Sequence, residues 1–88
     1  MYNYLVEFIG TTFFVYVIIA TGNPLAIGAA LALALLLTAP LSGGHLTPAV
    51  SFAMAAAGKL PTQELLPYCL SQVFGGLVAL EIFKRYQM

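Results

Sequence analysis

Charge is the scarcest property of this 88-residue sequence. Lys and Arg together number 3, Asp and Glu together number 3, and the formal net charge is zero. Charged residues make up 7% of the chain, against about a quarter in ordinary soluble domains. Three cations are too few to neutralise the phosphates of a nucleic acid backbone. Binding of nucleic acid through a basic surface is therefore excluded. A soluble domain of this size would also need more polar groups to cover its surface.

Cysteine is nearly absent, since Cys69 is the single one. One cysteine excludes a disulfide-stabilised scaffold, and an apolar share of 61% excludes disorder. We interpret Cys69 as a packed small hydrophobe, with a reactive thiol as the alternative. The sequence offers no set of nucleophile, base and orienting residue and no cluster of metal ligands. It therefore predicts no catalytic residues, no cofactor, no metal and no enzyme.

The chain contains a long segment without charged residues. The 51 residues from Phe8 to Gly58 contain no Asp, Glu, Lys or Arg. Such a run is long enough for two membrane spans of about 20 residues each. The start lacks a basic segment and carries Glu7, so we do not interpret it as a cleavable signal peptide. The sequence predicts an integral, multi-pass membrane protein with the lipid bilayer as a partner.

Three segments are predicted to span the membrane. The first is Tyr4–Ala20 and the second is Pro24–Ala39, begun by Asn23 as N-cap and ended by Pro40. The last runs from Thr62 to Arg85 and finishes in basic residues that can reach the lipid headgroups. Small residues recur at helical spacing along these segments, which favours close helix packing. The recurring residues are Ala26, Ala30 and Ala34; Ala49, Ala53 and Ala57; and Gly75 with Gly76.

Residues 41–47 are predicted to interrupt the helical pattern. They hold a glycine pair and are bracketed by Pro40 and Pro48. A new helix is expected from Pro48, capped by Thr47 and stopped by Gly58. Its ten or so residues rise about 15 Å, which is half a bilayer and is typical of a re-entrant segment. The predicted fold is all-α, with three transmembrane helices plus one re-entrant half-helix, in a single unit covering residues 1–88.

The interruption itself indicates a function. Irregular backbone at membrane depth is tolerated only where it is buried in protein or lines a water-filled cavity. The carbonyls of Gly43, Gly44, His45 and Leu46 are predicted to form a row of acceptors, followed by the positive end of the half-helix. This combination conducts neutral hydrogen-bonding molecules and repels cations, protons included.

The same residues match a family motif. Ser42 to Ala53 reads S-G-G-H-L-T-P-A-V-S-F-A and resembles the first pore-loop signature of aquaporins and glycerol facilitators, S-G-x-H-x-N-P-A-V-T. Glu7 to Thr11 looks like the family's first-helix motif, and Gln72 followed by Gly75 looks like its third helix. The resemblance implies a passive channel for water or small neutral solutes such as glycerol. It assigns Gly43, Gly44, His45, Leu46, Thr47 and Val50 to the pore lining, and Ser42, Thr47, Pro48 and Ala49 to the pore-loop motif.

Two departures from the family pattern bear on selectivity. Thr47 replaces the family's Asn, and its hydroxyl can accept from the helix and donate a single hydrogen outward. The alternative is that Thr47 is only an N-cap. Val50 occupies the position that matches the Arg of the family's second half. Spacing from the loop places Ile27, on the second span of one copy, and Leu35, on that of another copy, at the other walls, so the implied constriction is an apolar ring.

The resemblance covers one half of the family pattern. Family members contain two inverted repeats with the pore between them. The missing half is expected from a second copy in the opposite orientation or from a different protein. Lys59 on one side against Lys84 and Arg85 on the other is a weak charge bias, which favours dual topology and antiparallel homodimers. Family members assemble as tetramers of six-span units, which here would mean eight chains. The alternatives are a nonconducting regulatory or structural subunit, and an ion or proton leak channel.

Two polar side chains within the spans have expected roles. The resemblance implies that Glu7 is a buried brace accepting from pore-loop amides, and the alternative is a carboxylate among the headgroups. Gln72 is expected to bond to the pore loop or to another helix. His45 is interpreted as lining the vestibule or holding the loop, with a pH-sensing role as the alternative.

Overall fold

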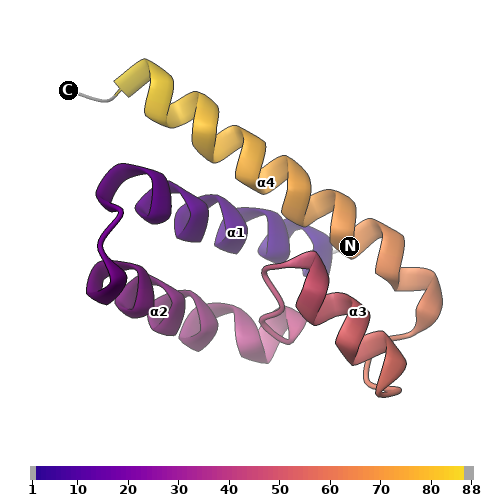
Figure 1. Cartoon of the computed structure of the whole chain (residues 1–88). Helices are drawn as coiled ribbons and strands as arrows, with labels where there is room; N and C mark the ends of the chain where they lie inside the picture. The colour runs from indigo at the N-terminus through magenta and orange to yellow at the C-terminus, as the bar shows by residue number, and fades with distance from the viewer. Residues whose placement is uncertain (1, 87–88) are drawn as a thin grey trace.

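The computed structural model describes residues 2–86, and these residues form helices and connecting loops without a strand. Helix α1 is Tyr2–Thr21, α2 is Pro24–Ser42, α3 is Pro48–Ala56, and α4 is Leu65–Tyr86, preceded by the 3-10 turn η1 at Thr62–Glu64. Figure 1 shows α1 lying between α2 and α4, with α3 beside the first part of α4. The first helix is therefore the centre of the fold.

Three of the helices are long and apolar enough to cross a membrane, which confirms the prediction of three spans. They are Tyr2–Thr21, Pro24–Ser42 and Thr62–Tyr86, with 20, 19 and 25 residues. Helix α3 has nine residues and rises about 13 Å, less than half of a 30 Å hydrocarbon core. The predicted all-α membrane fold of three long helices and one short helix is confirmed.

The ends of α2 follow from local chemistry, with one correction. The Asn23 side chain accepts from two backbone amides of the first turn, and Pro24 occupies the first helical position. The prediction that Pro40 ends this helix is wrong, because α2 continues to Ser42. A proline removes one N–H but leaves later bonds intact, and the Gly43 N–H donates to the Ala39 carbonyl across it (3.0 Å). Gly43 ends the helix in the left-handed region at φ 92°.

The start of the last helix also differs slightly from expectation. Thr62, the predicted first residue, lies in the 3-10 turn, and α4 proper begins at Leu65. Pro67 lies in the first turn of α4, where a backbone N–H has no partner within the helix. A proline is therefore accommodated there without loss of a helical hydrogen bond.

The contact between α1 and α4 depends on Gly75. A Cβ atom at this position would lie 2.8 Å from the Phe8 carbonyl oxygen, so a larger residue would push the two backbones apart. The Thr12 hydroxyl donates to the carbonyls of Phe8 (2.7 Å) and Gly75 (3.2 Å), which joins the helices at the same level. Gly76, its predicted partner in close packing, has only an ordinary contact with Val15.

The two alanine stripes have different surroundings. Ala30 and Ala34 are buried on α2. Ala49, Ala53 and Ala57, by contrast, are exposed, as is Phe52 between them. Among the elements of residues 2–86, α3 packs mainly on α4, with Ser51 as its buried residue. One face of the half-helix therefore has no neighbour within the described part of the chain.

Candidate functional site

Glu7 is the centre of a buried polar cluster that holds the interrupted loop. Its carboxylate is fully buried and accepts four hydrogen bonds. Oε2 accepts from the Ser42 hydroxyl (2.6 Å) and the His45 backbone amide (3.0 Å). Oε1 accepts from the Leu46 backbone amide (2.7 Å) and the Gln72 Nε2 (2.9 Å). An ionised carboxylate has about four acceptor sites, so the donors match its capacity.

The sequence places Glu7 there through one face of α1. Glu7, Gly10 and Thr11 are the three buried residues of this helix, and their spacing of three and four puts them on one side. A Cβ at Gly10 would come within 2.9 Å of the Leu46 side chain, so the glycine leaves room for the loop. The Thr11 hydroxyl donates to the Leu46 carbonyl (3.0 Å).

Leu46 is consequently held at both of its backbone polar groups, by Glu7 at the amide and by Thr11 at the carbonyl. It is also the one non-glycine residue with positive φ among residues 2–86, at 63°. A non-glycine residue in this region costs of order 1–3 kcal/mol and persists only where its surroundings enforce it. Its side chain is buried (1% exposed). The two bonds from α1 and this burial explain how the loop keeps a strained turn.

A second layer of the cluster links the loop to α3. Gln72 Nε2 donates both to Glu7 and to the Ser51 hydroxyl (2.8 Å), and Ser51 Oγ lies 2.9 Å from His45 Nδ1. In the tautomer that carries the imidazole proton on Nε2, Ser51 accepts from Gln72 and gives its one proton to Nδ1. The amide orientation of Gln72 is fixed by the carboxylate, and its Oε1 has no donor among the described residues.

Tyr68 completes the cluster and was missed by the sequence reasoning. Its hydroxyl donates to the Ser42 carbonyl (2.9 Å), and its ring centroid lies 5.0 Å from that of His45. The signal that would have found it is helical spacing. Tyr68, Gln72, Gly75 and Ala79 are the buried residues of α4 and recur every three or four positions.

The predicted pore-loop residues separate into a buried and an accessible group. Gly44, His45 and Leu46 are buried, Thr47 and Pro48 are half-buried, and Gly43, Ala49 and Val50 are exposed. Thr47 caps α3 in extended conformation, and its hydroxyl accepts weakly from the Val50 amide (3.4 Å). The carbonyls of Gly43, Gly44 and His45 accept no bond from residues 2–86, whereas the Leu46 carbonyl is occupied by Thr11.

The three residues of the predicted constriction do not meet within one chain. Leu35 lies against the loop, because a Cβ at Gly44 would come within 2.9 Å of its side chain. Ile27 is eight residues earlier on α2, about 12 Å along the helix axis, and Val50 is exposed on α3. An apolar ring made from all three therefore needs a second unit.

No group of three or more His, Cys, Asp or Glu side chains within the described residues is arranged to hold a metal ion. The site instead has three backbone carbonyl acceptors beside the N-terminus of α3. The Glu7 carboxylate, whose acceptor positions are all occupied, holds their loop in place. Acceptors and a fixed positive dipole bind and orient small polar molecules, and they supply no reactive group.

The sequence is similar to those of several known proteins. The glycerol uptake facilitator protein-like 6 of Lactiplantibacillus plantarum is 37% identical over 98% of this chain and 44% of its own length. Aquaporin-8 of Mus musculus is 36% identical over 91% of this chain and 35% of its own length. Aquaporin Z of Brucella melitensis is 48% identical over 48% of this chain and 18% of its own length. No solved structure matches the chain significantly.

The chain spans less than half the length of these relatives. The family model described as "Major intrinsic protein" matches residues 1–88. The chain therefore belongs to the major intrinsic protein family, as an integral multi-pass membrane protein whose fold corresponds to one half of the aquaporin fold.

Proposed function

We propose that the chain forms one half of a membrane channel for passive permeation of water or small neutral solutes such as glycerol. The observation that carries this proposal is the loop of residues 43–47, which Glu7 and Thr11 hold open beside the N-terminus of α3. Its carbonyls at Gly43, Gly44 and His45 take no bond from the rest of the described chain. Acceptors at this depth need water or a permeating molecule, since lipid offers no donor.

The pore residues then have different chemical roles. Gly43, Gly44 and His45 offer a row of acceptors that replaces part of the solute's hydration. Thr47 lies where that row meets the positive end of α3, and its hydroxyl gives one hydrogen toward the pore. The dipole disfavours cations at this point. Thr47 and Val50 leave the site without a fixed cation, so exclusion of protons rests on the dipole alone.

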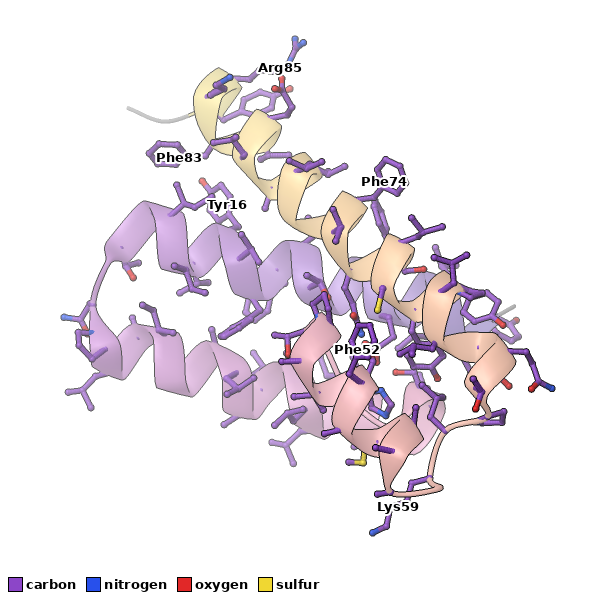
Figure 2. The ribbon with its side chains drawn as sticks, turned by 45° about the vertical axis from the view of Figure 1, so that its right-hand side comes forward. Tyr16, Phe52, Lys59, Phe74, Phe83 and Arg85 are labelled. Carbon is purple, nitrogen blue, oxygen red and sulfur yellow. The ribbon has the colours of Figure 1, made fainter. Side chains whose placement is uncertain are left out.

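The second wall of this pore is a unit of the same fold in the opposite orientation, in the simplest case a second copy of the chain. The exposed face of α3, with Ala49, Val50 and Ala53, supports this pairing because small residues let helices approach closely in lipid. The cations are also spread over both ends of the molecule, with Lys59 at one end and Arg85 at the other (Figure 2). Antiparallel pairs place Ile27, Leu35 and Val50 around one constriction, and four pairs make eight chains.

Proteoliposome swelling tests the channel. We expect the purified chain to raise osmotic water permeability, and Val50→Trp to abolish the increase by filling the constriction. Leu77→Trp is the matched control, since it adds the same ring on the outer side of α4, where Leu77 is 53% exposed. Permeability of the unaltered protein equal to that of empty liposomes would refute the channel.

The orientation of the second unit has its own test. Accessibility labelling of a C-terminal tag in intact cells should report both orientations if antiparallel copies form the pore. A single orientation would rule out the homodimer and leave a different protein as the source of the second half.

A further inference from the structure

An apolar groove runs between α1 and α4 on the side of the molecule away from the loop. It measures about 450 Å³ and is bordered by Ile9, Phe13 and Tyr16 of α1 and by Val78 and Ile82 of α4. We call it the α1–α4 groove. Thr12 also lines the groove, and its hydroxyl is bonded to the carbonyls of Phe8 and Gly75. The surface that the groove exposes is apolar, over the roughly 10 Å that separate Ile9 from Tyr16 along α1.

The border of this groove is unsuited to another helix. Helix association in lipid is favoured by small residues that let backbones approach, and six of the seven residues that line the groove are bulky. The exposed small residues lie elsewhere, at Gly28 and Ala32 on α2 and at Ala49 and Ala53 on α3. The molecule thus has a small-residue surface for a protein neighbour and a bulky, furrowed surface that fits flexible acyl chains.

Two cations stand at one end of the α1–α4 groove. Val78, Ile82 and Arg85 follow the spacing i, i+4, i+7 and share one side of α4, so Arg85 continues the groove's border toward the headgroups. Lys84 is adjacent. Figure 2 shows Arg85 at the end of α4 where Tyr16 and Phe83 face one another, and their rings form an edge-to-face pair.

Glu81 neutralises these cations only in part. Its carboxylate lies 3.8 Å from Lys84 Nζ and 4.0 Å from Arg85 Nε, and all three side chains are more than half exposed. These distances exceed the 2.7–2.9 Å of a charge-assisted hydrogen bond, so the donors of both cations stay available. Two cations against one carboxylate leave a net positive charge beside a hydrocarbon furrow.

We propose that the α1–α4 groove is a binding site for an anionic phospholipid. One acyl chain lies along Ile9, Phe13 and Ile82, and the headgroup phosphate is bound by Arg85 and Lys84. The occupant follows from charge complementarity at the groove's end and from its purely apolar walls, and the site is independent of whether the chain conducts water. Lys59 lies at the opposite end of the molecule from Arg85 (Figure 2) and is not among the residues that border the α1–α4 groove.

Native mass spectrometry of the full chain in detergent tests the site, with phosphatidylglycerol and phosphatidylcholine of equal acyl length as probes. We expect retention of phosphatidylglycerol in preference to phosphatidylcholine. The double change Lys84→Gln and Arg85→Gln should reduce that preference at least fivefold, which is the effect of about one cation at an anionic headgroup. Lys59→Gln is the matched control and should leave it unchanged.

Two further variants separate the groove from the headgroup contact. Ile82→Trp should fill the groove and weaken retention of both lipids. Leu77→Trp, on the outer side of α4, should leave retention unchanged. If Ile82→Trp does not fold, Val78→Phe is the alternative groove-filling variant. Glu81→Gln should raise the phosphatidylglycerol preference severalfold, a gain that misfolding cannot produce. Equal retention of the two lipids, an equal loss in Lys59→Gln, or full retention in the groove-filling variant would overturn the site.

Discussion

Replacing Glu7 by Gln should destabilise the fold by several kcal/mol, although the two side chains have nearly the same shape. The carboxylate accepts four bonds, two at each oxygen, from Ser42, His45, Leu46 and Gln72. An amide turns one of the two positions into a donor that faces donors, so two bonds are lost. Hydrogen bonds to a charged acceptor contribute about 1.5–3 kcal/mol each, which predicts a loss of about 3–6 kcal/mol. This is a large part of the 5–15 kcal/mol that ordinarily stabilises a folded domain.

Unfolding in detergent micelles by increasing fractions of dodecyl sulfate, followed by circular dichroism, measures this loss. Glu81→Gln is the matched control, because the same chemical change there affects a carboxylate that is 58% exposed and makes only long contacts. We expect it to alter the unfolding free energy by less than about 0.5 kcal/mol. A Glu7→Gln protein within about 1 kcal/mol of the unaltered protein would refute the idea that the carboxylate holds the loop.

Three other substitutions test neighbouring parts of the structure in the same unfolding assay. Tyr68→Phe removes the bond to the Ser42 carbonyl but keeps the ring, so a loss of about 0.5–1.5 kcal/mol is expected, and no change would show that the bond contributes nothing. Gly75→Ala places a methyl group 2.8 Å from the Phe8 carbonyl oxygen and should lower the free energy of unfolding by about 1–3 kcal/mol. The control Gly28→Ala, with open space around it, should be neutral or stabilising by up to about 1 kcal/mol. Equal effects of the two substitutions would contradict the close approach of α1 and α4. Thr47→Val removes the cap of α3 and should cost about 0.5–2 kcal/mol, while Thr47→Asn keeps a capping group and should cost less.

The helices were largely predictable, because their signals are local. Apolar length predicted the three long helices, and Asn23-Pro24 and Thr47-Pro48 predicted where α2 and α3 begin. The end of α2 was predicted wrongly at Pro40. A proline removes only the hydrogen bond of its own N–H, so the helix continues beyond it to Ser42. Only the left-handed backbone at Gly43 decides where α2 stops.

The arrangement of the site was less accessible from sequence. Which atoms of the loop face Glu7 depends on the positive φ values at Gly43, Gly44 and Leu46, and no single-residue preference predicts the last of these. Tyr68 lies within an apolar helix that could have presented any of its faces to the loop. Its role depends on the rotation of α4, which the contact at Gly75 determines.

The sequence separations within the Glu7 cluster have a bearing on how the protein is made. The partners of this carboxylate follow it by 35, 38, 39 and 65 residues. At a synthesis rate of about 5–20 residues per second, Gln72 emerges roughly 3–13 s after Glu7. Until Ser42 emerges, 35 residues after Glu7, the first helix carries an acidic residue with none of its final partners, and an acidic residue at the centre of a membrane helix costs about 2.5–3.5 kcal/mol. Helix α1 is nevertheless long and apolar enough to cross a membrane, so the later segments complete the hydrogen bonding of a carboxylate that the first span has already brought into the fold.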